Sequence, residues 1–433
     1  MRQGYFLMAF WCVSVLFPAA SPALSLEDAV QQGLESSLNL KKSLIDLSSA
    51  EYSAKRLWAE VFPTISGTVG ASYSSKLFSG DGFELDKEIL NTSAGAGIVL
   101  TLNAGIPFTM KNIKLAYQTR LLNYEDARNQ LEIQITKNFY SLIADRDNLA
   151  SLEYMLQLAQ RQYDRDQVAF RNGVIGEMTL MQSRLGLQNA RYSLSAARSA
   201  YTNRMSDFFS QLGIAHDADI ALEGKIQIVK IEANADNLIR EYLPRRPDII
   251  SRRQEIERLE NTRKQLSSSG KAPSLSARLS ADWTGQGMDP FIDKLSDKLS
   301  GSASITIPID PWLPGTSRSQ SVRAAKLAVD KARLDLQSAE DAAVAQIRSL
   351  AANLRNSWDS IEIARLSVGV AERGYELTDQ GFRNGTVESL KLGDARNNLI
   401  NARQRLLQAE LSYLNMILDI SAALNINWKD LMK

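Results

Sequence analysis

The sequence predicts a mainly α-helical chain with a smaller β-sheet section, built as two tandem repeats. Three observations lead to this fold class: an internal repeat, apolar residues at seven-residue intervals, and four segments of alternating polarity. The tetrapeptide Phe-Arg-Asn-Gly at residues 170–173 returns at residues 382–385, an offset of 212. At this offset, 20 of the 56 residues from Ala159 onward are identical. The two halves are therefore expected to share one architecture.

Seven-residue ladders of apolar side chains run on both sides of each tetrapeptide. Before it stand Ile135, Leu142, Leu149, Leu156, Tyr163 and Phe170, and in the second half Ile347, Leu354, Ile361, Val368, Tyr375 and Phe382. After it stand Leu180, Leu187, Leu194, Tyr201 and Phe208, and then Leu392, Leu399, Leu406, Tyr413 and Ile420. This is the period of a supercoiled helix seam. Because Asn-Gly supplies the positive φ angles of a tight reversal, each half should hold an antiparallel coiled-coil hairpin, with tips at residues 171–175 and 383–387.

The composition argues against most enzyme classes and against nucleic-acid binding. The chain has 50 basic and 49 acidic residues, so it lacks the basic excess that releases counterions from a nucleic acid. Its single cysteine, Cys12, and single histidine, His216, leave little for thiol catalysis, histidine acid–base chemistry or a zinc site. Adjacent carboxylates such as Glu340 and Asp341 are typical of a solvated helix face. We expect no enzymatic activity, no cofactor and no bound metal.

The N-terminus has the pattern of an export signal. Arg2 precedes an apolar run over residues 5–17, and small residues stand at the positions that a signal peptidase reads, Ser21 and Ala23. Residues 1–23 are therefore predicted to be a cleaved signal peptide. Trp11 in front of Cys12 argues against lipidation of that cysteine. Elsewhere no stretch approaches the ~20 apolar residues of a spanning helix, so any membrane section must consist of strands.

The first repeat is expected at residues 24–214. A helix should run from Leu26 to about Val61, where Pro63 stops it. Alternating polarity then predicts strands at about 64–75 and 94–103, followed by the first long hairpin. A linker at residues 215–235 follows, and its residues 226–231 predict a short strand or a packing segment.

The second repeat, residues 236–433, should follow the same plan. A helix is expected to begin near Pro247 and to end at the Ser-Ser-Ser-Gly sequence of residues 267–270. Strands are predicted at about 274–284 and 299–308, and the second hairpin follows. Strands of about ten residues with one apolar face suit a barrel in an outer membrane. Four strands cannot close such a barrel, so several chains would have to share one.

The order of these elements resembles the TolC family of outer-membrane efflux proteins over essentially the whole mature chain. The resemblance is carried by the internal repeat and the two Asn-Gly tips, together with several short motifs. These motifs are Leu-Glu-Asp-Ala at residues 26–29, Asn39 in the opening helix, Pro63, and Arg-Pro-Asp at residues 246–248. No single motif is specific, but their order is.

The resemblance implies a homotrimer whose twelve strands form one barrel in outer-membrane lipid, with a hollow helical cylinder extending into the periplasm. A helix of 55 residues would be about 80 Å long, which suits such a tunnel. Family members are passive conduits for cargo handed over by a periplasmic adaptor protein and an inner-membrane pump or ABC transporter. The cargo itself is not specified.

The resemblance also implies two kinds of site. The hairpin tips meet the adaptor in this family, and the matching residues are Asn172, Gly173, Val174, Asn384, Gly385 and Thr386. The periplasmic entrance is commonly closed by two acidic residues beyond the second tip, and these positions hold Lys391 and Asp394, with Thr179 at the position of Lys391 in the first repeat. An intrachain pair of Lys391 with Asp394 is expected, because residues three apart on a helix can face each other. The alternative is a solvated pair outside the lumen.

A different class of protein is compatible with the same helical pattern. A periplasmic coiled-coil scaffold or adaptor would also have an export signal and helical hairpins, without entering the membrane. Adaptors place their hairpin inside β-rich domains and normally have one hairpin, whereas this sequence predicts a tandem pair. Recovery in the soluble periplasmic fraction would favour the scaffold.

Overall fold

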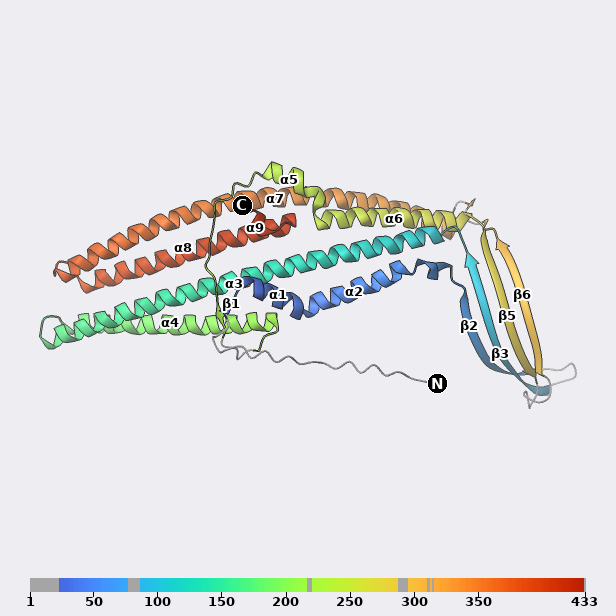
Figure 1. Ribbon diagram of the computed structural model, residues 1–433, viewed down its shortest axis with the longest axis horizontal. Coiled ribbons are helices and arrows are strands. Elements are labelled where there is room, and N and C mark those ends of the chain that lie inside the picture. The colour runs from blue at the N-terminus through green and yellow to red at the C-terminus, as the bar shows by residue number, and fades with distance from the viewer. Residues whose placement is uncertain are drawn as a thin grey trace, which may run out of the picture.

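The computed structural model describes residues 23–76, 86–215, 220–286, 295–309, 312–313 and 315–431. The expected signal peptide lies outside this part of the chain except for Ala23, and so do Cys12 and His216. The described chain is elongated, with helices over most of its length and a four-stranded sheet at one end (Figure 1).

The first repeat contains the helices and strands up to the end of the first hairpin. They are β1 Ala23–Leu24, α1 Leu26–Ser36, α2 Leu38–Lys55, the 3-10 helix η1 Leu57–Val61, β2 Thr64–Lys76, β3 Asp86–Leu102, α3 Ile106–Arg171 and α4 Glu177–Leu212. The linker and second repeat hold β4 Ala221–Leu222, α5 Ala235–Tyr242, η2 Leu243–Arg245, α6 Pro247–Lys271, β5 Ser274–Gln286, β6 Leu295–Thr306, α7 Ser317–Arg383, α8 Ser389–Leu424 and α9 Trp428–Leu431.

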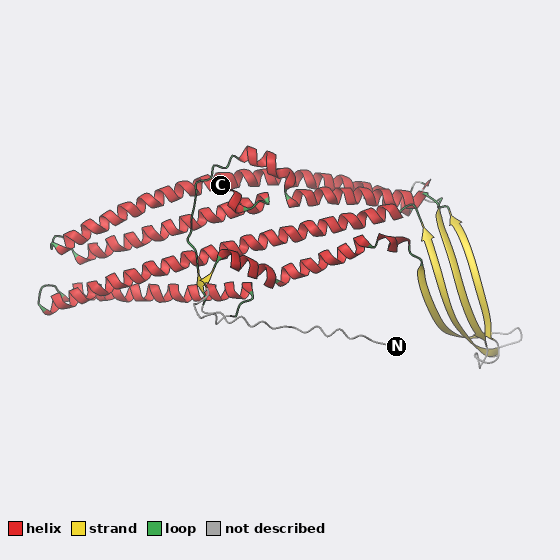
Figure 2. Ribbon diagram, viewed as in Figure 1, coloured by secondary structure: helices red, strands yellow, loops and turns green. Residues whose placement is uncertain are grey.

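Two long helical hairpins, α3 with α4 and α7 with α8, make up most of the molecule. Their tips lie together at the end opposite the sheet (Figure 2). The hairpins contact each other chiefly through α3 and α8. As a result, α4 and α7 form the two edges of this helical layer (Figure 1).

Each hairpin has an ion pair between its two helices, and the two ion pairs lie at equivalent positions of the repeat. In the first, Arg198 Nη2 of α4 lies 2.8 Å from Glu153 Oε1 of α3. In the second, the charges are exchanged: Arg365 of α7 pairs with Glu410 of α8 at 3.4 Å. All four residues are related by the repeat offset. The pairing geometry therefore persists although the sequences of the two hairpins differ at both positions. Such partly exposed pairs contribute up to ~1 kcal/mol each.

The predicted ladders form the buried seams of the hairpins in their middle part. Ile135, Leu187, Leu354 and Leu399 are all buried. Close to the tip the seam opens, since Phe170 is 39% exposed. The packing that stabilises the hairpins is thus concentrated away from the tips.

The opening helix and the helix before β5 differ from the sequence-based expectation. The predicted helix from Leu26 is broken at Ser37, whose side chain accepts a hydrogen bond from the Leu40 N–H and so caps α2. Helix α1 lies close against α3, because a Cβ at Gly33 would be only 2.3 Å from Ile135 Cδ1. In the second repeat, α6 continues through the expected Ser-Ser-Ser-Gly stop to Lys271. Serine and glycine lower helix propensity, but the contact of α6 with α3 outweighs this cost.

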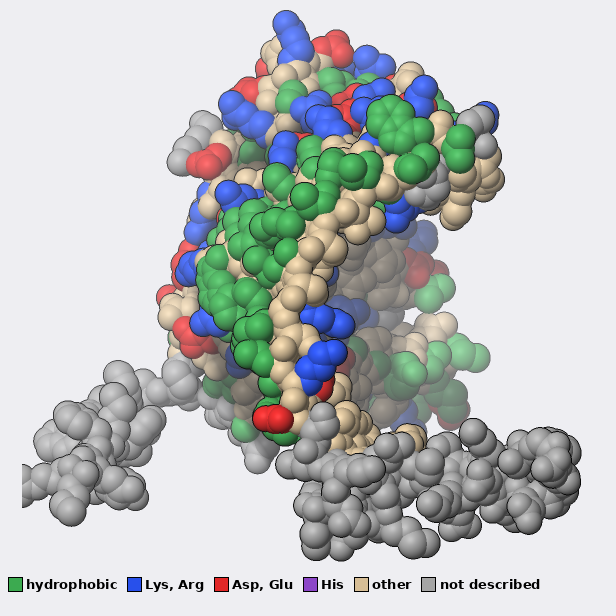
Figure 3. Space-filling model, turned by 90° about the vertical axis from the view of Figure 1, so that its right-hand side faces the viewer, with side chains coloured by type: hydrophobic (Ala, Val, Ile, Leu, Met, Phe, Trp, Pro, Cys, Tyr) green, Lys and Arg blue, Asp and Glu red, His purple; other side chains and the backbone are tan. Residues whose placement is uncertain are grey.

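The sheet has the strand order β2-β3-β5-β6, and all neighbours are antiparallel. Strand β3 begins at Asp86, earlier than the expected position near residue 94. The register places Ile98 opposite both Ile65 and Leu279, and Leu275 opposite Ile305. One face of the sheet is therefore mainly apolar, with Thr92 and Asp297 as its polar exceptions toward the end away from the helices. Seen from the sheet end, hydrophobic side chains form a continuous band over it (Figure 3).

The linker crosses the middle of the hairpins and packs on their core. The Tyr413 hydroxyl of α8 donates a hydrogen bond to the Val229 carbonyl at 3.0 Å and accepts one from the Ile231 N–H at 2.9 Å. Ile226 and Ile228 pack against the same core. Residues 226–231 therefore form a packing segment, while the short strand of the linker is β4, paired in parallel with β1.

Across the described residues, no helix combines the length and apolar character needed to cross a membrane. The same residues contain no group of three or more His, Cys, Asp or Glu side chains that could hold a metal ion.

Candidate functional site: the hairpin tips and the groove between the hairpins

The two tips have the same backbone geometry. Gly173 and Gly385 have φ angles of +71° and +74°. Three residues beyond the last residue of each helix, the Val174 N–H donates to the Ala169 carbonyl at 2.8 Å and the Thr386 N–H donates to the Gly381 carbonyl at 2.9 Å. These bonds cap the carbonyls at the ends of α3 and α7.

Only the glycines of the tips take a positive φ, in contrast to the expectation for both residues of Asn-Gly. Asn172 and Asn384 have φ angles of −85° and −84° and end their helices. A Cβ added at Gly173 or Gly385 would meet nothing within 4 Å. Glycine is therefore needed for its backbone conformation and not for space.

The tips differ in the side chain that directly follows the glycine. Val174 is 74% exposed and presents an apolar side chain to solvent at the first tip. Thr386 is exposed too, but its hydroxyl donates a hydrogen bond to the Gly381 carbonyl at 3.0 Å. All six expected contact residues thus lie together at the free end of the molecule, and one of them also stabilises its own turn.

The expected gate residues lie within the first turns of the returning helices. Lys391 and Asp394 are exposed on α8, and Thr179 is half-buried on α4. No ion pair joins Lys391 to Asp394 in the described chain, contrary to the expected intrachain pair. Both side chains are solvated, and a pair three residues apart gains too little to fix two flexible side chains.

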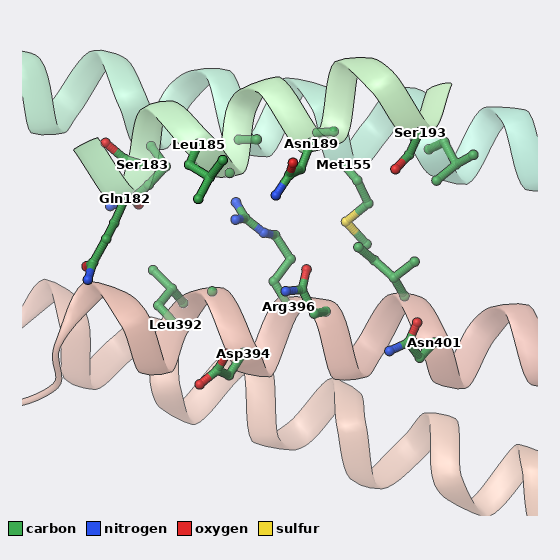
Figure 4. A pocket seen from close by; sticks show the side chains of 18 of the residues that line it. Met155, Gln182, Ser183, Leu185, Asn189, Ser193, Leu392, Asp394, Arg396 and Asn401 are labelled. Carbon is green, nitrogen blue, oxygen red and sulfur yellow. The ribbon is translucent and has the colours of Figure 1, made fainter. Parts of the chain in front are cut away.

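Asp394 borders a groove of about 710 Å³ between the two hairpins, just above the tips. The groove is lined by α3, α4 and α8, and most of its polar groups are uncharged amides and hydroxyls. Figure 4 shows Arg396 reaching from α8 across this space toward Leu185 and Asn189 of α4. A Cβ at Gly186 would lie 3.8 Å from Arg396 Nη2, so the guanidinium comes close to the backbone of the opposite hairpin.

Arg396 is the groove residue that the sequence analysis missed. Burial lowers the pKa of its guanidinium, and the nearby Tyr375 partly offsets this. Within the described residues, the guanidinium has no hydrogen-bond or ion-pair partner. The sequence did contain one indication of its importance. Arginine stands at the same position of both repeats, as Arg184 and Arg396. Arg184 is exposed, however, so the repeat alone does not reveal the burial.

Several solved outer-membrane proteins share this architecture. The Campylobacter jejuni CmeC outer membrane channel is 19% identical, with a TM-score of 0.74 over 92% of this chain and 85% of that one. The Vibrio cholerae outer membrane protein VceC is 15% identical, with a TM-score of 0.72 over 93% and 96%. The open state of the Neisseria gonorrhoeae MtrE outer membrane channel is 15% identical, with a TM-score of 0.74 over 93% and 89%. At these identities the likeness concerns the fold.

No curated protein matches the sequence. The family model for outer membrane efflux proteins, in contrast, matches residues 29–213 and 238–425. The two matched segments coincide with the two repeats and leave out the linker between them. The chain therefore belongs to the outer membrane efflux protein family.

Proposed function

We propose that the chain is one of three identical subunits of a passive conduit through the outer membrane. In this assembly the sheets of three chains form one twelve-stranded barrel in the lipid, and the hairpins form a tunnel into the periplasm. A periplasmic adaptor and an inner-membrane pump or ABC transporter deliver the cargo, as in tripartite efflux or type I secretion.

The two faces of the sheet are the observation that carries this proposal. Its apolar face holds side chains such as Val69, Leu299 and Ile305, which are 91%, 75% and 69% exposed. A sheet face of this kind needs an apolar environment. β2, β5 and β6 contain 13, 13 and 12 residues, which is long enough for tilted strands to cross a bilayer.

The edges of the sheet supply the reason for a trimer. β2 and β6 each have a single neighbour among the described strands, so each leaves one row of backbone groups without a strand partner. Unpaired edges cannot lie in lipid, and the smallest lipid-spanning barrels have eight strands. Three copies would pair β6 of each chain with β2 of the next.

The helical layer has complementary edges as well. Apolar residues stand at matching spacings of zero, three, seven and fourteen on both edge helices: Met178, Met181, Leu185 and Tyr192 on α4, and Ile363, Leu366, Val370 and Leu377 on α7. We call these the edge stripes. All eight side chains are more than half exposed, and Leu185 also borders the groove between the hairpins. Met181 and Leu377 each lie eight residues from their tip glycine, and Tyr192 and Leu366 each lie 19. Packing α4 of one copy against α7 of the next would bury both stripes.

Docking of the adaptor is assigned to the tips in this proposal. They are the part of the tunnel that lies farthest from the sheet, and their six named residues are all exposed. The entrance is assigned to the returning helices just above the tips. There three copies of Asp394 would form a negative ring, with Lys391 and Thr179 beside it.

The test begins with the location of the wild-type protein. Membranes and soluble periplasm are separated after expression of the full chain, and the detergent-extracted protein is run with and without heating. We expect it in the outer-membrane fraction as a heat-sensitive trimer that conducts ions in a planar bilayer. Recovery as a soluble periplasmic protein without conductance would overturn the conduit and support a periplasmic scaffold instead.

A further inference from the structure

The polar face of the sheet carries one charge that has no counter-charge near it. This face consists almost entirely of small residues, such as Ser276, Ser280 and Ser302. Arg278 stands among them. The register places Val99 of β3 on one side of it and Ser302 of β6 on the other.

The remaining charges in the middle of this face are of opposite sign and stand at paired positions. Asp282 of β5 lies directly opposite Lys298 of β6. The Asp282 carboxylate also accepts a hydrogen bond from the Ser280 hydroxyl at 3.0 Å and leans over Gly95, where a Cβ would be 2.7 Å from Oδ1. These contacts keep the Asp282 carboxylate close to its own position along the strand.

Arg278 is too far along the strand for Asp282 to compensate it. Four strand residues correspond to about 13 Å, which exceeds the screening length of about 8 Å at physiological salt. Within the described chain, the Arg278 guanidinium has no hydrogen-bond or ion-pair partner, and its side chain is exposed. It is therefore free to extend away from the sheet on the polar side.

We propose that Arg278 determines the ion preference of the membrane section and makes this section favour anions. The inference depends on the proposed trimer, in which the apolar face contacts lipid and the polar face lines the lumen. Three Arg278 side chains then form a positive ring at one level. Rings of arginine or lysine select for anions in pores, and substitutions on the lumen face of a barrel tune selectivity without affecting the lipid contact.

The ring would act separately from the periplasmic entrance. Asp394 lies beyond the opposite end of the helices, and its proposed ring is negative. The barrel and the entrance would therefore have opposite preferences. Anionic cargo would be favoured at the final step, in the lumen that leads out of the cell.

The experiment uses trimers of the full chain in planar bilayers under a KCl gradient. We expect the chloride preference to fall in Arg278→Gln and to shift further toward potassium in Arg278→Glu. Ser302→Gln, at the same level on β6, adds bulk without charge and should leave the preference unchanged. Asp282→Asn should raise the chloride preference, because Lys298 then lacks its neighbour.

A cysteine experiment tests the position of the side chain independently of its charge. Because Cys12 is the only cysteine of the chain, the wild-type protein is the background control. Arg278→Cys should react from the aqueous side with charged methanethiosulfonates, and the cationic reagent should restore the chloride preference that the anionic reagent reverses. Leu279→Cys, on the apolar face, should not respond.

The outcomes separate this inference from the conduit itself. Conducting Arg278→Glu trimers with wild-type ion preference, or Arg278→Cys trimers unaffected by either reagent, would overturn the role of Arg278 and leave the conduit intact. Wild-type protein that forms no channels would overturn the conduit, and the ring with it.

Discussion

At the scale of single residues, the hairpin tips depend on two glycines whose conformation other residues rarely adopt. Gly173 and Gly385 both have a left-handed backbone, and the space around each is open. The residues that follow them are therefore accessible to a partner without being part of a core. This makes the position after the glycine suitable for testing recognition separately from folding.

Val174→Asp should leave assembly intact and weaken export. Val174 is 74% exposed, and its side chain makes no contact that the turn needs. Val174→Thr is the matched control, since the second tip has threonine there. The corresponding Thr386→Asp is less informative, because it also removes the hydroxyl bond to Gly381. Export of a reporter cargo by cells with equal amounts of trimer is the measurement. Wild-type export by Val174→Asp would argue against adaptor docking at this tip.

Asp394→Ala should lower the cation preference of the periplasmic entrance, and Lys391→Ala should raise it. Both side chains are exposed and unpaired with each other, so each contributes its full charge to the ring. Single-channel recordings with cations added on the tip side measure preference and block. If neither variant changes either quantity, the constriction lies elsewhere along α4 and α8.

At the scale of elements, the environment of each strand side chain depends on the face of the sheet to which it points. Successive residues of a strand point to opposite faces. Ile305 lies opposite Leu275 on the apolar face, whereas Ser304 lies opposite Ser276 on the polar face. A single-residue step along β6 thus moves a side chain from the proposed lipid contact to the proposed lumen.

Ile305→Arg should reduce assembly in the outer membrane, and Ser304→Arg should be tolerated. An arginine on the lipid face costs about 2–4 kcal/mol near the middle of the membrane, and each trimer contains three copies. The yield of heat-sensitive trimer in the outer-membrane fraction is compared for the two variants. Equal yields would mean that the faces of the sheet are assigned wrongly.

The start of α6 is fastened to α7 by a buried arginine. Arg246 is 8% exposed, bonds both oxygens of Asp248 at 3.0 and 2.8 Å, and reaches Gln346 of α7 at 3.2 Å. Burial alone would raise the pKa of Asp248. The hydrogen bonds and charge of Arg246, together with the Ile249 N–H, instead hold this pKa below its usual range.

Asp248→Asn should destabilise the chain by about 2 kcal/mol, because Arg246 then stays buried without a counter-charge. The lowered pKa means that the Asp248 carboxylate stabilises the fold fully above the unfolded pKa of about 3.9 and progressively less as the pH falls below it. Urea denaturation midpoints should therefore differ between wild type and variant at pH 7 and converge in acid. Asp236→Asn is the control, since its pair with Arg348 is exposed. A constant difference at every pH would contradict this role.

At the scale of the whole molecule, the single chain leaves two edges of the helical layer and two edges of the sheet exposed. The edge stripes on α4 and α7 are apolar and share two levels, eight and 19 residues from the tip glycines, although the two helices lie far apart in one chain (Figure 1). A rotation that places β6 of one copy beside β2 of the neighbouring copy would also place α7 beside α4 of that neighbouring copy. The same copies would close both layers.

Leu366→Glu should weaken the trimer, because it places a charge in a seam of apolar side chains at a cost of about 2 kcal/mol per interface. Tyr154→Glu is the matched control, since Tyr154 occupies the same position in the first repeat, is 49% exposed, and lies on α3 outside the edge stripes. The temperature at which trimers dissociate is measured for both. A lower temperature for Tyr154→Glu alone would place the interface elsewhere.

The repeat, the long hairpins, the tips and the four strands could all be predicted from the sequence. These features depend on local periodicity: heptad spacing selects supercoiled helices, alternation selects two-faced strands, and Asn-Gly selects a reversal. The close packing of α1 on α3 at Gly33 and Ile135, and the contact of α6 with α3, were not predictable in this way. Both depend on partners more than a hundred residues away.

The tertiary structure also decided which of several similar charges matter. Arg184 and Arg396 are equivalent in sequence, yet only Arg396 is half-buried between the hairpins. Asp282 and Arg278 lie on the same face of one strand, yet only the register shows that Lys298 stands beside Asp282 and a serine beside Arg278. Periodicity assigns a side chain to a face, but its environment depends on the neighbouring elements, whose register and packing are long-range properties.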